Sequence, residues 1–94
     1  MTESELGEIG EEIFNFVKEN FPNALSWPIK SRYFMTKLEN DLVTISYERF
    51  KSDNSWRPSR NIYIKEKDLG NYNGDNVFVD STCKHLPIKK YKKE

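Results

Sequence analysis

The sequence is poor in the residues that build metal centres and many catalytic sites. Only one cysteine and one histidine occur among its 94 residues. A single cysteine excludes an intramolecular disulfide and is typical of a reducing compartment. A structural zinc site takes four ligands, mainly cysteine and histidine, and Cys83, His85 and Asp80 are too few of the right kind. Glycine-rich phosphate-binding motifs are missing as well, so we expect neither a metal nor a cofactor.

Long hydrophobic runs are also missing. No stretch approaches the roughly 18 apolar residues that a membrane-spanning helix needs. The acidic N-terminal residues lack the basic and apolar regions of a signal peptide. The sequence therefore predicts a cytoplasmic location and no membrane partner.

The polar composition still leaves enough apolar surface for one core. Mean hydropathy is −0.83, but the chain has six phenylalanines, five tyrosines and two tryptophans. Each buried aromatic side chain removes about 150–250 Å² from water, whereas disordered chains contain few aromatics. Because independent domains usually need about 50–200 residues, we expect residues 1–94 to form a single small domain.

Charge is balanced overall but distributed unevenly. Fifteen basic and fifteen acidic residues give a net charge of zero. Residues 1–22 contain six acidic residues and one basic residue, and residues 23–94 contain nine acidic and fourteen basic residues. This asymmetry indicates either an anionic partner for the basic part or simply an acidic, solvated helix face.

One amphipathic helix is predicted over residues 3–21. Its apolar residues recur at spacings of three and four and form one apolar stripe: Leu6, Ile9, Ile13, Phe16, Val17 and Phe21. Phe14 is expected at the flank of this stripe. Thr2 and Glu5 fit a capping box, and Pro22 ends the helix.

Two glycines lie inside this helix. Gly7 and Gly10 each cost roughly 1 kcal/mol relative to alanine in a helix interior. We therefore expect either fraying of the first turns or, at Gly10, close packing on the buried side.

After residue 22 the apolar period changes to two, which is typical of strands. We predict strands over residues 32–38, 42–50, 60–65 and 77–80, and the segment 86–91 could add an edge strand. The residues expected to face inward alternate along these strands: Val43, Ile45, Tyr47, Ile62, Ile64, Val77 and Val79.

The connections complete the fold prediction. A polar turn at 39–41 makes the first two strands a hairpin, and the composition of residues 51–59 indicates a loop. A helix followed by three to five strands with short connections predicts an α+β domain, in which the helix packs on a small antiparallel meander sheet.

Catalysis is not expected. Cys83 and His85 would point to the same side of an extended segment, and a thiolate beside an imidazole can act as a nucleophile–base pair. Their spacing carries no family signature, and a buried structural cysteine explains Cys83 better. We therefore expect a protein that is not an enzyme.

The segment 49–67 is the most unusual part of the chain. It contains three of the four arginines together with Trp56 and Tyr63. Arginine suits phosphates and aromatic rings stack on bases, so basic and aromatic residues on one surface favour nucleic-acid binding. The residues expected to take part are Arg49, Lys51, Trp56, Arg57, Arg60, Tyr63 and Lys65.

Two observations weigh against this hypothesis. Trp56 could anchor the loop in the core, and the pI of about 6.6 is low for a dedicated DNA-binding protein.

Other parts of the chain leave further functions open. The basic C-terminal tail, 84–94, could bind phosphates or only solubilise the chain. The alternative function is a protein-binding inhibitor or adaptor that uses the acidic helix or the tryptophan–arginine loop.

Overall fold

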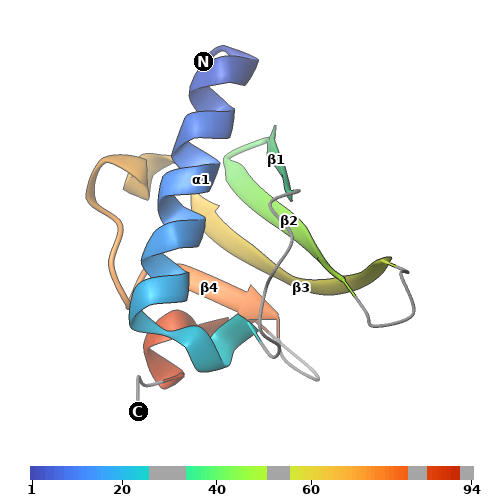
Figure 1. Ribbon diagram of the computed structural model, residues 1–94. Helices are drawn as coiled ribbons and strands as arrows, with labels where there is room; N and C mark the ends of the chain where they lie inside the picture. Colours follow the sequence, from blue (N-terminus) through green and yellow to red (C-terminus); the bar gives the residue numbers. More distant parts are fainter. Residues whose placement is uncertain (26–33, 51–55, 81–84, 92–94) are drawn as a thin grey trace.

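The computed structural model describes residues 1–25, 34–50, 56–80 and 85–91. A single long helix, α1 (Glu3–Asn20), packs across one face of a five-stranded sheet (Figure 1). The strands are β1 (Phe34–Glu39), β2 (Leu42–Phe50), β3 (Trp56–Lys65), β4 (Val77–Asp80) and β5 (His85–Pro87). They pair in the order β1-β2-β3-β4-β5, each antiparallel to the next. The predicted α+β meander is confirmed.

Helix α1 begins with the capping box that the sequence predicted. The Glu5 amide donates to Thr2 Oγ1 at 3.1 Å, and the Thr2 amide donates to Glu5 Oε1 at 3.5 Å. These bonds satisfy donors that have no partner within the helix. At the other end, the Phe21 amide donates to the Val17 carbonyl at 2.7 Å, and the chain enters a short 3₁₀ turn, η1 (Pro22–Leu25).

The core lies between α1 and the inner face of the sheet. From the helix, Ile13, Phe14 and Val17 are buried. The sheet contributes the alternating residues that the sequence placed inward: Val43, Ile45, Tyr47, Ile62, Ile64, Val77 and Val79. The Phe14 ring meets the Tyr47 ring edge to face at 5.2 Å between centroids, so Phe14 belongs to the core and not to the flank of the apolar stripe.

Gly10 determines how closely α1 approaches the sheet. It is buried, and a Cβ at this position would overlap the Oγ1 atom of Thr36 on β1. Gly7, which is exposed, has nothing within 4 Å of the same hypothetical atom. Close packing at Gly10, one of the two expectations drawn from the sequence, is therefore confirmed.

The main difference from the sequence prediction is at the start of β3. The strand begins at Trp56, so that residues 56–59 are strand and not loop. Their polar composition and Pro58 gave a loop signal, but pairing with Glu48–Phe50 of β2 holds them extended. Proline is compatible with a strand that has a free edge.

The C-terminal segment also differs from a simple solubilising tail. After β5, a 3₁₀ turn η3 (Ile88–Lys90) buries the Ile88 side chain completely. The Lys89 amide donates to the Gly74 carbonyl at 3.0 Å, and Lys89 Nζ pairs with Asp75. Residues 85–91 of the basic tail are thus held against the domain by strand pairing, by the buried Ile88 and by the contacts of Lys89.

Candidate nucleic-acid interface

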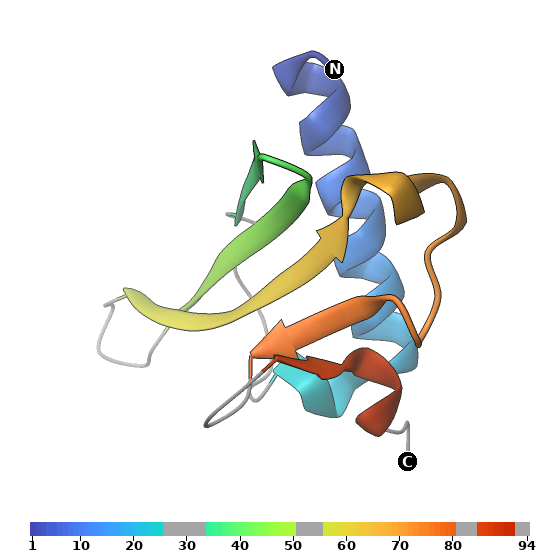
Figure 2. The same ribbon diagram turned by 180° about the vertical axis from the view of Figure 1, so that it is seen from behind.

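The face of the sheet opposite α1 is polar and is not covered by any helix of the described residues (Figure 2). Residues that alternate with the core residues share this outer face, because successive side chains in a strand point to opposite sides. The outer-face positions near its centre and on β4 and β5 are Thr44, Ser46, Asn61, Tyr63, Lys65, Phe78, Asp80 and His85. Asn61, Tyr63 and Lys65 therefore lie on the face opposite Ile62 and Ile64, which were correctly predicted to face inward.

Three neighbouring strands bring Tyr63, Asp80 and His85 together on the outer face. The His85 ring stacks on the Tyr63 ring, with 4.2 Å between centroids and 22° between planes. His85 Nε2 lies 3.3 Å from Asp80 Oδ1, and the Tyr63 hydroxyl donates to Asp80 Oδ2 at 3.2 Å. We call these three residues the outer-face cluster.

Asn61 completes the hydrogen bonding of this cluster. Its backbone amide donates to Asp80 Oδ2 at 3.3 Å, and its side-chain Nδ2 donates to the Tyr63 hydroxyl oxygen at 3.1 Å. Asp80 on β4 therefore has hydrogen-bonding or charged partners on both neighbouring strands, β3 and β5. Such a network fixes ring orientations that would otherwise cost entropy to order on binding.

The environment of Tyr63 also affects its ionisation. Partial burial, the largest cause, raises the pKa of Tyr63 above its ordinary value of 10.0. The hydrogen bond from Asn61 acts in the opposite direction and lowers this pKa, whereas the Asp80 carboxylate raises it further. The Tyr63 hydroxyl is consequently neutral near physiological pH and acts as a donor to Asp80.

A β-bulge separates the body of the sheet from the far end of β2 and β3. Ser46 pairs with Asn61 and Glu48 with Pro58, so two residues of β3 oppose one residue of β2. Bulges bend a strand and increase its twist, and β3 curves visibly away from the body at this end (Figures 1 and 2).

Arg60 lies at the bulge, and its contacts are structural. One guanidinium nitrogen donates to the Ala24 carbonyl at 3.3 Å, and the guanidinium carbon lies 5.2 Å from the centre of the Tyr91 ring. This side chain therefore connects η1 and the end of the chain to β3. Arg60, which was predicted to contact phosphate, therefore has a role in the fold.

Beyond the bulge, β2 and β3 form a two-stranded ribbon, Glu48–Phe50 with Trp56–Pro58. In the described residues, neither β1 nor β4 pairs with this part of the two strands. The backbone register places Arg49 opposite Arg57 and Phe50 opposite Trp56. Four residues of the predicted basic and aromatic segment thus form two directly opposed cross-strand pairs.

The remaining predicted positions are distributed differently. Lys65 is exposed at the end of β3 and shares the outer face with Tyr63. Lys51 lies outside the described residues. The sequence hypothesis omitted Asp80 and His85; the alternation of Asp80 with Val77 and Val79 already placed it opposite the core, whereas no local pattern indicated the position of His85.

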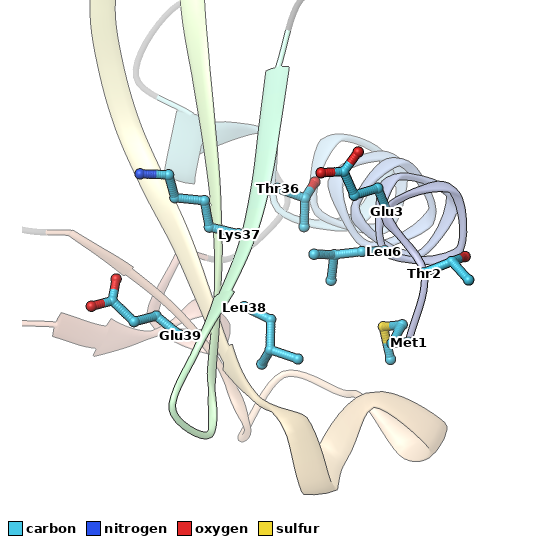
Figure 3. A pocket seen from close by; sticks show the side chains of 8 residues that line it. All are labelled: Met1, Thr2, Glu3, Leu6, Thr36, Lys37, Leu38 and Glu39. Carbon is cyan, nitrogen blue, oxygen red and sulfur yellow. The ribbon is translucent and has the colours of Figure 1, made fainter.

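A separate hollow of about 510 Å³ lies between the start of α1 and β1. Figure 3 shows Leu6 and Thr36 pointing toward each other across it, while Lys37 and Glu39 point to the other side of the strand. Met1 at the rim is 60% exposed. This hollow is on the helix side of the sheet and is not continuous with the outer-face cluster.

Two features are absent from the described part of the chain. No group of three or more histidine, cysteine, aspartate or glutamate side chains is placed there to hold a metal ion. None of the helices in that part has the length and apolarity needed to cross a bilayer. Comparison of the chain with protein-family models, with curated proteins and with solved structures gave no match.

Proposed function

We propose that this protein is a non-enzymatic accessory protein that binds nucleic acid through the outer face of the sheet and the β2–β3 ribbon. The observation that carries the proposal is the ribbon register, in which Arg49 lies opposite Arg57. Like charges at directly opposed positions destabilise an antiparallel pair. A phosphate bound between two such positions would offset this repulsion, and arginine is well suited to bind it.

Aromatic positions accompany the charges. Phe50 and Trp56 occupy the neighbouring cross-strand pair, and the stacked Tyr63 and His85 rings lie on the outer face of the sheet. Proteins that bind single strands combine a basic track for the backbone with rings on which bases stack. The ribbon and the outer face together contain both kinds of group, and Lys65 is an exposed basic residue of the outer face.

Binding of labelled oligonucleotides at several salt concentrations tests this proposal. Wild-type affinity should fall steeply with salt, because each neutralised phosphate releases counterions. Arg49→Ala and Arg57→Ala should each weaken binding and reduce the salt slope by about one unit. Trp56→Ala should cost roughly 1–3 kcal/mol of binding energy if its ring stacks on a base. No binding to any oligonucleotide at low salt would refute the proposal.

Lys18→Ala is the matched control for the arginine variants. Lys18 is exposed on α1, which lies on the other side of the sheet from the outer face. Lys18→Ala removes one positive charge, as each arginine variant does, but at a site away from the proposed interface. Its affinity and salt slope should therefore remain those of the wild type. A loss as large as that of Arg57→Ala would mean that binding depends on net charge and not on the ribbon.

A second candidate function, a protein-binding inhibitor or adaptor, is favoured by the acidic solvent face of α1. Glu8, Glu11 and Glu19 are all exposed on this helix, and such a face suits a basic partner surface. Pull-down from native lysate with and without nuclease distinguishes the two candidates. A nuclease-resistant partner that is lost with Glu8→Lys/Glu11→Lys, but retained with Arg57→Ala, would support this second function.

A further inference from the structure

We propose that the ligand is a single-stranded nucleic acid and that one of its bases stacks on the exposed side of the His85 ring. This inference rests on the proposed function and specifies its ligand. The sequence hypothesis assigned base stacking to Trp56 or Tyr63. The structure instead places His85 over one side of the Tyr63 ring, so His85 is the outer member of the pair.

Exposure supports this order of the two rings. The His85 side chain is 54% exposed, whereas Tyr63 is partly buried in the sheet. A base that approaches from solvent along the stack therefore reaches the His85 ring first. Histidine is among the side chains on which unstacked bases are commonly placed.

The His85 ring is also held in place before any ligand binds. Asp80 Oδ1 lies 3.3 Å from Nε2 on one side, and Tyr63 stacks beneath the ring. Asp80 itself is fixed by Asn61 and by the Tyr63 hydroxyl. A ring that is already ordered loses little rotamer freedom on binding, and this lowers the entropic cost of the complex.

The geometry favours a single strand over a duplex. Bases within a duplex are stacked on both sides, so a ring on an open sheet surface has no free base to contact. Direct reading of duplex DNA needs a helix or a ribbon that enters a groove. The outer-face cluster lies on β3, β4 and β5 and not on the projecting ribbon, and it suits an extended strand with exposed bases.

Protonation of His85 should strengthen the interaction. Asp80 from β4 and Tyr63 from β3 are the titratable groups that contact the His85 ring among the described residues. With a neutral His85, the Asp80 carboxylate leaves the outer-face cluster negative and repels phosphates. With a protonated His85, the cluster is neutral and the ring donates to the carboxylate. His85 is the only histidine of the chain.

Three variants separate the stacking of His85 from its charge. His85→Ala removes both, and it should weaken binding of a labelled single-stranded oligonucleotide by roughly 5- to 150-fold, the usual effect of one lost stacked base. His85→Phe keeps a ring, so it should bind within a few-fold of wild type near neutral pH without gaining affinity on acidification. Asn15→Ala, which changes an exposed residue of α1 on the opposite side of the sheet, is the matched control and should bind like wild type.

The closing experiment measures these affinities for a single-stranded oligonucleotide and for the duplex of the same sequence, between about pH 5.5 and 8, and follows the His85 imidazole signals by NMR during each titration. The inference requires preference for the single strand, loss with His85→Ala, retention with His85→Phe and movement of the imidazole signals. If wild type binds but does not prefer single strands, or if the imidazole signals stay unchanged, this inference is wrong while nucleic-acid binding stands. If wild type binds neither ligand, the proposed function itself is wrong.

Discussion

Gly10 on α1 lies directly against the Thr36 side chain on β1, which leaves no room for a side chain at position 10. A Cβ on Gly10 would overlap Thr36 Oγ1 and would lie 3.0 Å from Thr36 Cβ and Cγ2. Thr36 belongs to an edge strand, so this contact helps to hold β1 to the rest of the core. Glycine at this position therefore lowers the helix propensity of α1 but allows a close helix–sheet contact.

Substitution of the two helix glycines should have opposite effects. Gly10→Ala forces α1 away from β1, and we expect a loss of roughly 1–3 kcal/mol in the free energy of unfolding from overpacking. Gly7→Ala is the matched control, because nothing lies within 4 Å of its added methyl group. It should stabilise the protein by up to about 1 kcal/mol through helix propensity. Chemical denaturation of both variants tests this, and equal effects would contradict the packing role.

Two residues of the helix stripe should also differ in their contributions. Ile13 is fully buried, whereas Phe16 is partly exposed and contacts the rings of Phe21 and Tyr72 at the rim. Ile13→Ala should cost roughly 2–5 kcal/mol because it leaves a cavity under the helix. Phe16→Ala should cost less, since its site is open to water. A larger loss of stability for Phe16→Ala than for Ile13→Ala in thermal denaturation would mean that Phe16, and not Ile13, lies at the centre of the core.

Helix α1 and the inward faces of the strands were predictable because their signals are local. Apolar spacings of three and four, and then of two, depend only on neighbours in sequence, and they correctly placed residues such as Ile13 and Ile45 in the core. The start of β3 was not predictable in this way. Pro58 and the polar residues around it indicate a loop, and only their pairing with β2 beyond the bulge makes them strand.

The candidate site depended even more on long-range pairing. The sequence could place Tyr63 on the outer face, but the stacking with His85 depends on three strands in register, with Asp80 opposite His85. No local pattern sets that register. Arg60 shows the reverse case, because it was predicted from its charge to contact phosphate, whereas its partners, Ala24 and Tyr91, are 36 and 31 residues away in sequence.

The contacts of Arg60 predict an effect on stability. Arg60→Ala removes a hydrogen bond to the Ala24 carbonyl and the cation–π contact with Tyr91. We expect a loss of roughly 1–2 kcal/mol in the free energy of unfolding. Lys65→Ala, which removes an exposed charge from the same strand, should change it by less than about 0.5 kcal/mol. Thermal denaturation distinguishes the two variants, and an Arg60→Ala protein as stable as Lys65→Ala would show that these contacts add nothing.

Alkaline titration should detect the partly buried hydroxyls of Tyr63 and Tyr72. Burial and the Asp80 carboxylate raise the pKa of Tyr63, and burial followed by the Glu12 hydrogen bond raises the pKa of Tyr72. Because the folded protein holds these two protons more tightly than the unfolded chain does, their contribution to stability is fully present below about pH 10 and is lost as the pH rises through the folded-state pKa values. Ultraviolet absorbance should show a late-titrating fraction among the five tyrosines. Tyr63→Phe should remove part of that fraction and leave the part due to Tyr72, whereas Glu12→Gln should move only the Tyr72 part to lower pH. A single transition for all five in the folded wild-type protein would contradict the hydrogen bonds of both hydroxyls.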